Sequence, residues 1–149
     1  MIKIIHPIAG AMAILTITIF WLSTLLSELF ASQEVIIAIK TTIPWGFFLL
    51  VPAIALAGGS GFKLANRRRG GVIGAKVKRM PIIAVNGILI LIPSALFLAA
   101  KAQASEFDTS FYAVQALELV AGAVNISLLS LNMRDGFKIK GRLKRHRRE

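Results

Sequence analysis

The stretch Ser110–Met133, SFYAVQALELVAGAVNISLLSLNM, is an apolar run long enough to cross a lipid bilayer as a helix. Polar and small residues recur within it at Gln115, Glu118, Gly122, Asn125 and Asn132. Their spacing of three, four, three and seven residues places them on one face of an α-helix. A carboxylate in hydrocarbon costs about 3 kcal/mol. We therefore expect Glu118 to face other protein groups or trapped water, and not lipid.

The composition of the chain indicates an integral membrane protein. Of its 149 residues, 56% are hydrophobic, and the mean hydropathy is +0.71. This length predicts one compact unit, which we assign to residues 1–149. The absence of cysteine excludes disulfides, thiol nucleophiles and iron–sulfur clusters. The two histidines, His6 and His146, are too few for most zinc sites, so we expect no metal centre.

Four apolar segments predict four transmembrane helices. Their expected bounds are about 4–29, 33–57, 81–100 and 109–133. The predicted fold is an all-α, four-helix antiparallel bundle, with a basic loop at 59–80 and a basic tail at 134–149. We expect the fourth helix to end near Gly136 and Pro81 to lie in the first turn of the third. The first segment is longer than a signal-peptide core and has no cleavage site, so we interpret it as a retained span.

The distribution of charge predicts the orientation of these spans. Sixteen of the eighteen lysine and arginine residues lie at the N-terminus, in the loop 59–80 or in the tail. The other two, Lys40 and Lys101, we assign to the two remaining connections. The positive-inside rule then places both termini and the basic loop in the cytoplasm. The chain resembles small four-span bacterial inner-membrane proteins, which implies this topology and the inner membrane as its location, but no chemistry.

The basic loop is predicted to contact anionic lipid headgroups or a partner protein. The cations concerned are Arg67, Arg68, Arg69, Lys76, Lys78 and Arg79. The glycines near them lack the spacing of a phosphate-binding loop, and no folded nucleic-acid reader accompanies them, so nucleic acid is not an expected partner. Asp135 is expected to pair with Arg134, Arg79 or another of these cations, tying the fourth span to the loop.

The polar face of the fourth span has two interpretations. Gln115, Asn125 and Asn132 can hydrogen-bond across helices and specify packing, with Asn86 on the third span as a facing partner. Glu118 can instead be a proton or cation site, because ionisable groups within a membrane are candidates for function. The sequence leaves both interpretations open.

The first span begins with His6-Pro7, and Gly10 follows one helical turn later on the same face. This short pattern resembles transmembrane b-type cytochromes. The resemblance implies haem b with His6 as an axial ligand and Gly10 making room for the macrocycle. No other span contains a histidine, so the second ligand would be Met80, Met133, or His6 of a second protomer.

No set of nucleophile, base and orienting group is visible, so no catalytic residues are predicted and we do not expect an enzyme. The leading hypothesis is a non-enzymatic accessory or scaffold subunit that packs through the polar face of the fourth helix, within the bundle or against a partner. The expected partners are membrane lipids, other membrane subunits or a second copy of the chain. The alternatives are the haem protein and a small proton- or cation-coupled carrier that uses Glu118.

Overall fold

The computed structural model describes residues 2–65 and 71–145, which are helical apart from two short connections at 31–32 and 104–108. The helices are α1 (Ile2–Phe30), α2 (Gln33–Ala65), α3 (Gly71–Asn86), the π-helix η1 (Gly87–Leu91), α4 (Ile92–Gln103) and α5 (Thr109–Arg145). Four stretches are long and apolar enough to cross a membrane: Ile4–Phe30, Gln33–Lys63, Val77–Gln103 and Thr109–Lys138. The described residues contain no strand, in keeping with the predicted all-α class.

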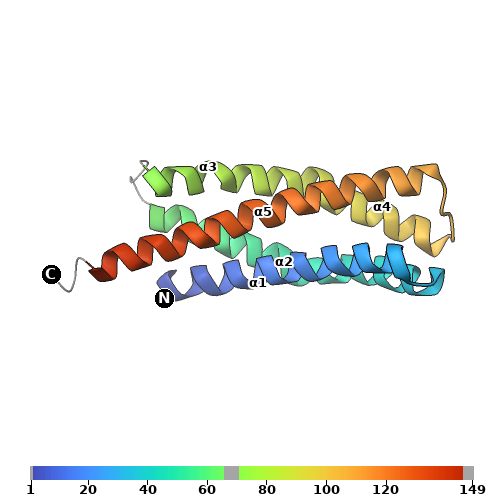
Figure 1. Ribbon diagram of the computed structural model, residues 1–149, viewed down its shortest axis with the longest axis horizontal. Helices are drawn as coiled ribbons and strands as arrows, with labels where there is room; N and C mark the ends of the chain where they lie inside the picture. The colour runs from blue at the N-terminus through green and yellow to red at the C-terminus, as the bar shows by residue number, and fades with distance from the viewer. Residues whose placement is uncertain (1, 66–70, 146–149) are drawn as a thin grey trace.

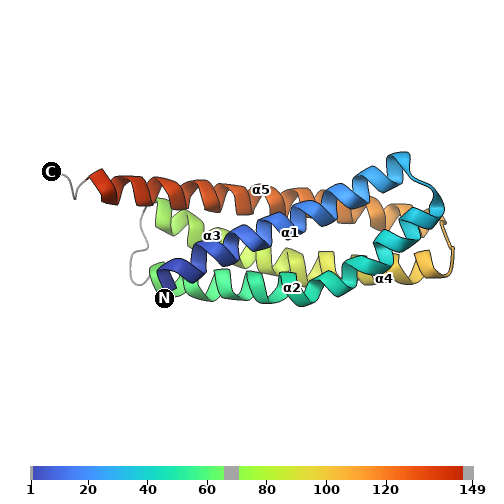
Figure 2. The same cartoon turned by 90° about the horizontal axis from the view of Figure 1, so that it is seen from below.

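The long helices lie side by side along one axis (Figures 1 and 2). The connections between α1 and α2 and between α4 and α5 lie at one end of the molecule. The first turn of α1, the last turn of α2, the start of α3 and the last turn of α5 lie towards the other end. α1 packs against α2 and α5, and α2 also contacts both halves of the third span.

The helices extend further than the predicted spans. Residues 59–65 and 71–80, expected in a loop, continue α2 and form the start of α3, while Arg67, Arg68 and Arg69 lie outside the described residues. The prediction that the last helix ends near Gly136 is wrong, because α5 continues to Arg145. A glycine inside a helix costs only about 1 kcal/mol, and lysine and arginine are good helix formers. The basic sequence after Gly136 therefore prolongs the helix.

The third span changes its helical geometry at its centre. The backbone N–H of Ile92 bonds to the carbonyl of Gly87, five residues back, and so closes a π-helical turn. Pro93 follows in the first turn of α4. Proline donates no backbone hydrogen bond and its ring clashes with the carbonyl four residues back, so the wider turn before it relieves that conflict. Pro81 lies inside α3, ten residues from its start, and not in its first turn as predicted.

Two apolar clusters form the interior. The larger one joins α1, α2, α3 and α5 around Ala13, Ile17, Leu50, Ala53, Ile83 and Leu129. The smaller one lies near the short connections and consists of Ile36, Leu98, Ala102 and Phe111. Lys40 and Gln115 each follow a member of the smaller cluster by one helical turn, so a polar layer separates the two clusters.

Asp108 caps the N-terminus of α5. Its Oδ1 accepts hydrogen bonds from the backbone N–H of Phe111 at 2.9 Å and from the Ser110 hydroxyl at 2.6 Å. Its Oδ2 accepts one from Lys101 Nζ at 2.7 Å, and Lys101 also binds Glu106. These bonds, that from Lys101 above all, hold the pKa of Asp108 well below its usual range.

This cap predicts a specific loss of stability in acid. Because the folded pKa of Asp108 is depressed, its contribution is complete above the ordinary carboxyl pKa of about 4 and disappears as the pH falls towards the folded value. Asp108→Ala should lower the melting temperature near neutral pH and flatten its fall in acid. Thermal unfolding in detergent, followed by circular dichroism against pH, measures both effects. Asp108→Asn, which retains a capping oxygen, is the control; equal acid sensitivity of Asp108→Ala and the natural protein would refute the assignment.

Candidate functional site

The polar residues of α5 point into the protein. Gln115, Asn125 and Asn132 are buried, Gly122 is buried, and the Glu118 side chain retains 12% exposure. Each of the four polar side chains bonds to a neighbour. The face that the sequence singled out is therefore an interior face of the molecule in this structure.

Glu118 forms an ion pair with Lys40 of α2. Lys40 Nζ lies 2.9 Å from Glu118 Oε2, and the Lys40 side chain is only 1% exposed. The ammonium also donates to Thr24 Oγ1 of α1 at 3.4 Å, and Gln115 Nε2 donates to the same Glu118 oxygen at 3.4 Å. An ammonium and a carboxylate this close compensate much of each other's desolvation cost.

The assignment of Lys40 to a connection between spans is wrong, whereas the predicted start of the second helix at residue 33, which places Lys40 inside that helix, is confirmed. Lys40 lies two turns inside α2, on the same face as the buried residues Ile36 and Ile43. That spacing of four and three residues was present in the sequence and could have identified Lys40 as an interior residue. Counting it as a loop charge concealed the partner of Glu118.

Glu28 of α1 adds a second carboxylate beside this pair. It interacts electrostatically with both Lys40 and Glu118. Among the described residues, the buried side-chain oxygens without a hydrogen-bond partner are Glu28 Oε1 and Gln115 Oε1. We call Glu28, Lys40 and Glu118 the buried charge cluster. Its formal charge with all three groups ionised is −1. The unpartnered Glu28 oxygen can take a proton, and the unpartnered Gln115 oxygen can accept a hydrogen bond from water.

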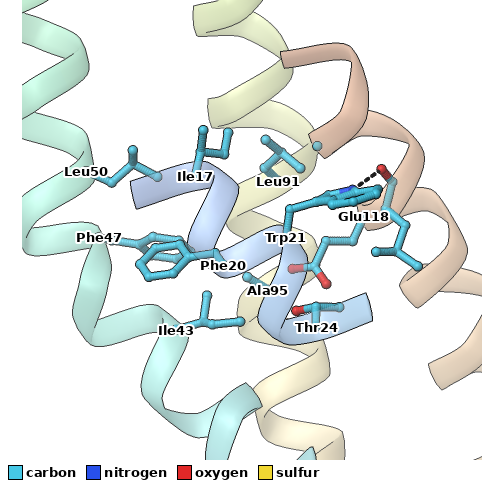
Figure 3. Close-up of a pocket in the computed structure, with 12 residues that line it drawn as sticks. Ile17, Phe20, Trp21, Thr24, Ile43, Phe47, Leu50, Leu91, Ala95 and Glu118 are labelled. Atoms are coloured by element: carbon cyan, nitrogen blue, oxygen red, sulfur yellow. Dashed lines mark hydrogen bonds between the residues drawn. The ribbon is translucent and has the colours of Figure 1, made fainter. Parts of the chain in front are cut away.

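Trp21 closes one side of the cluster. Its indole N–H donates to the Leu119 carbonyl at 2.8 Å, and its ring lies against Gly122. Figure 3 shows Trp21, Thr24 and Glu118 around a small cavity of about 50 Å³, which is otherwise lined by apolar side chains such as Phe20 and Phe47. The cavity is large enough for a water molecule beside the carboxylate.

An amide layer lies about two turns further along α5. Asn86 Nδ2 donates to Asn125 Oδ1 at 2.8 Å and to the Ala121 carbonyl at 2.9 Å. Asn125, which is fully buried, also donates to the Ile83 carbonyl at 3.4 Å. Asn86 is the last residue of α3 before η1, so this layer fixes the third span to α5 where its geometry changes.

The amide layer should contribute much less to stability than a buried charge does. Interhelical hydrogen bonds in membrane proteins average about 0.6 kcal/mol each. Asn125→Ala, which loses two of them, is expected to lower the free energy of unfolding by about 1 kcal/mol. Reversible unfolding in mixed detergent micelles measures the change. A loss as large as that expected for an unpaired buried charge would contradict this interpretation.

A third polar layer joins α3 to α5 at the basic end. Arg79 Nη1 lies 2.7 Å from Asp135 Oδ2 and donates to Asn132 Oδ1 at 3.4 Å. Arg134 lies 3.6 Å from the same aspartate. The prediction that Asp135 pairs with Arg134, Arg79 or another of the cations is thus confirmed. Of the other predicted headgroup contacts, Lys78 is exposed and Lys76 lies in α3.

The residues of the haem hypothesis have protein contacts in this structure. His6 Nδ1 lies 3.0 Å from both the Ala57 carbonyl and Ser60 Oγ, and the Ser60 hydroxyl bonds to the Leu56 carbonyl. This network fits a proton on Nδ1, donated towards α2. Met80 Sδ accepts a hydrogen bond from Asn132 at 3.3 Å, and an added Cβ at Gly10 would meet open space. Haem binding stays a prediction, and a Soret band that disappears in His6→Ala would be its signature.

Within residues 2–65 and 71–145, no group of three or more histidine, aspartate and glutamate side chains is arranged to hold a metal ion. The chain matches no known family of proteins, no curated protein and no solved structure.

Proposed function

We propose that this chain is a four-span protein of the bacterial inner membrane with both termini in the cytoplasm, and that it acts as a non-enzymatic accessory subunit. The four apolar helices support the membrane location. Lysine and arginine are concentrated in the sequence where α1 begins, α2 ends, α3 begins and α5 ends. These parts of the helices lie towards one end of the molecule (Figure 1), which supports the orientation.

One observation carries the accessory role: the polar groups on the inner face of α5 are used within the chain. The pairs Lys40–Glu118, Asn86–Asn125 and Arg79–Asp135 each join two helices. Such contacts specify a fixed helix arrangement, as a scaffold requires. A partner subunit would then dock on the apolar outer faces, where Trp45 and Phe48 of α2 are among the most exposed large side chains.

Photo-cross-linking tests this role directly. A photoreactive phenylalanine analogue at Phe48 should capture a partner subunit or a second copy in intact membranes, and native gels in mild detergent should show an assembly larger than the monomer. The same analogue at Val120, which is exposed on α5, is the control for random collisions. A monomer in both experiments would overturn the proposal.

A proton-coupled carrier is a second candidate, and the unpartnered oxygens beside the ion pair favour it. Glu28 Oε1 can accept a proton, and Gln115 Oε1 can accept a hydrogen bond from a water molecule next to the Glu118 carboxylate. Carboxylates at membrane depth are the usual elements of proton relays.

Flux measurements separate this candidate from the accessory role. In proteoliposomes, Glu28→Gln and Glu118→Gln should abolish pH-driven flux, whereas Glu34→Gln, at an exposed carboxylate in the first turn of α2, should leave it intact. Circular dichroism and thermal unfolding confirm that the variants are folded. Flux that is unchanged in all three variants would eliminate the carrier.

A further inference from the structure

A large apolar cavity lies between the helices, and no residue of the buried charge cluster lines it. It shares wall residues, among them Ile17 and Phe47, with the small cavity beside Glu118. The volume of the large cavity is about 490 Å³, within the range of roughly 300–1,000 Å³ typical of small-molecule sites. α1, α2, the third span and α5 all contribute to its wall, and carbon atoms dominate the lining. The polar side chain in the wall, Asn125, already bonds to Asn86 and Ile83. The cavity therefore suits a hydrocarbon ligand.

The position of the cavity matches one leaflet of a bilayer. On α2 its wall extends from Phe47 to Phe62, a length of about 22 Å at the helical rise of about 1.5 Å per residue. Phe62 lies at the basic end of the apolar stretch Gln33–Lys63, and Phe47 lies near its middle. The hydrocarbon core of a bilayer is about 30 Å thick, so this length is sufficient for one lipid acyl chain.

The π-helix contributes to the shape of this cavity. Gly87, Ile88 and Leu91 of η1 all line it. π-helical turns within α-helices occur often at functional sites. Here the widened turn faces the inner part of the cavity, where the end of an acyl chain would lie.

The end of the cavity at the membrane surface is positively charged. Lys63 follows the lining residue Phe62, and Lys78 precedes the lining residue Met80 by two positions; both lysines are exposed. Arg79, which lies between Lys78 and Met80 in the sequence, is paired with Asp135. The sequence from Lys63 to Arg79 contains no acidic residue. This charge complements a phosphate headgroup, and basic sites on the cytoplasmic side of membrane helices bind such headgroups.

We propose that the cavity binds one acyl chain of an anionic phospholipid, with Lys63 and Lys78 at its headgroup. The ligand enters from the basic leaflet and its chain extends inward to η1. The residues that line the cavity include neither Phe48 nor any member of the buried charge cluster. The variants that test lipid binding therefore differ from those that test the accessory and carrier roles.

Electron paramagnetic resonance of spin-labelled lipids tests the proposal. The protein is reconstituted in phosphatidylcholine vesicles with a trace of phosphatidylglycerol, or of phosphatidylcholine, labelled near the end of one chain. Labelled phosphatidylglycerol should give the larger motionally restricted component. Lys63→Gln and Lys78→Gln should each weaken its binding about fivefold, as expected for one lysine near an anionic headgroup. Lys138→Gln, an exposed lysine on α5, is the matched control. Equal restriction of the two lipids would overturn the headgroup assignment.

A second variant tests the cavity itself. Gly59 lines the cavity, and a Cβ added there meets nothing within 4 Å. Gly59→Leu is therefore expected to add apolar volume at the cavity wall, and leucine also favours the helix. In Gly59→Leu, the motionally restricted component of labelled phosphatidylglycerol should fall to the level that ordinary boundary lipid gives. Ala116→Leu, on the exposed side of α5, should leave it unchanged. A restricted component that persists in Gly59→Leu would overturn the proposal.

Discussion

Lys40→Met is expected to destabilise the protein by about 3–5 kcal/mol, which is the usual cost of removing one partner of a buried ion pair. Lys40 is 1% exposed and its Nζ lies 2.9 Å from Glu118 Oε2. Its removal leaves the carboxylates of Glu28 and Glu118 near each other without a cation. Reversible unfolding in mixed micelles measures the loss, and Lys138→Met at an exposed position should change stability by less than about 1 kcal/mol.

A double-mutant cycle separates the ion pair from simple packing. If Lys40 and Glu118 stabilise each other, Lys40→Met combined with Glu118→Leu should cost clearly less than the sum of the single changes. Part of the loss of stability should remain in the double variant, because Glu28 of the buried charge cluster still lacks its cation. Single variants that lose only a few tenths of a kcal/mol, or additive losses, would contradict the assigned pair.

Gly122→Leu is expected to disrupt the packing of α5 against α1. A Cβ at this position would lie 2.7 Å from Trp21 Cδ1, so the indole has to move and its 2.8 Å bond to the Leu119 carbonyl is lost. Overpacking of this kind costs about 1–3 kcal/mol, and the lost hydrogen bond adds to it.

Fluorescence reports the displacement of Trp21 directly. The chain has two tryptophans, so in a Trp45→Phe background the emission comes from Trp21. In Gly122→Leu the emission maximum of Trp21 should shift, and the melting temperature of the protein should fall. Gly10→Leu is the control, because an added Cβ there meets nothing within 4 Å. An unchanged emission maximum with full stability would show that Trp21 does not pack on Gly122.

The helical class and the inward face of α5 were accessible from the sequence because both depend on local periodicity. A helix with Gln115, Glu118 and Asn125 on one face has few stable alternatives in hydrocarbon. The pairing of Asp135 was predictable for another reason: it is an acidic residue among the many cations at the basic end of the helices.

The partner of Glu118 was not predicted, because the pairing of distant helices depends on their rotation and depth. Lys40 is separated from Glu118 by 78 positions, and a rule that counts charges between spans treats such a lysine as a loop residue. The π-turn at Gly87 and the continuation of α5 beyond Gly136 were also missed. Both depend on how neighbouring backbone groups are satisfied, and residue propensities carry little of that information.

The carboxylate of Glu118, within the apolar stretch of α5, is paired with Lys40 of the same chain. Solid-state NMR in lipid bilayers tests it most directly, through the dipolar coupling between ¹⁵N-labelled lysine Nζ and the ¹³C-labelled carboxyl carbon of Glu118, assigned from the signal lost in Glu118→Gln. Because Lys40 Nζ lies 2.9 Å from Glu118 Oε2, we expect a strong coupling between the lysine nitrogen and the Glu118 carboxyl carbon, and its loss in Lys40→Met. A Glu118 carboxyl carbon that couples to lipid chain protons and to no lysine nitrogen would contradict it.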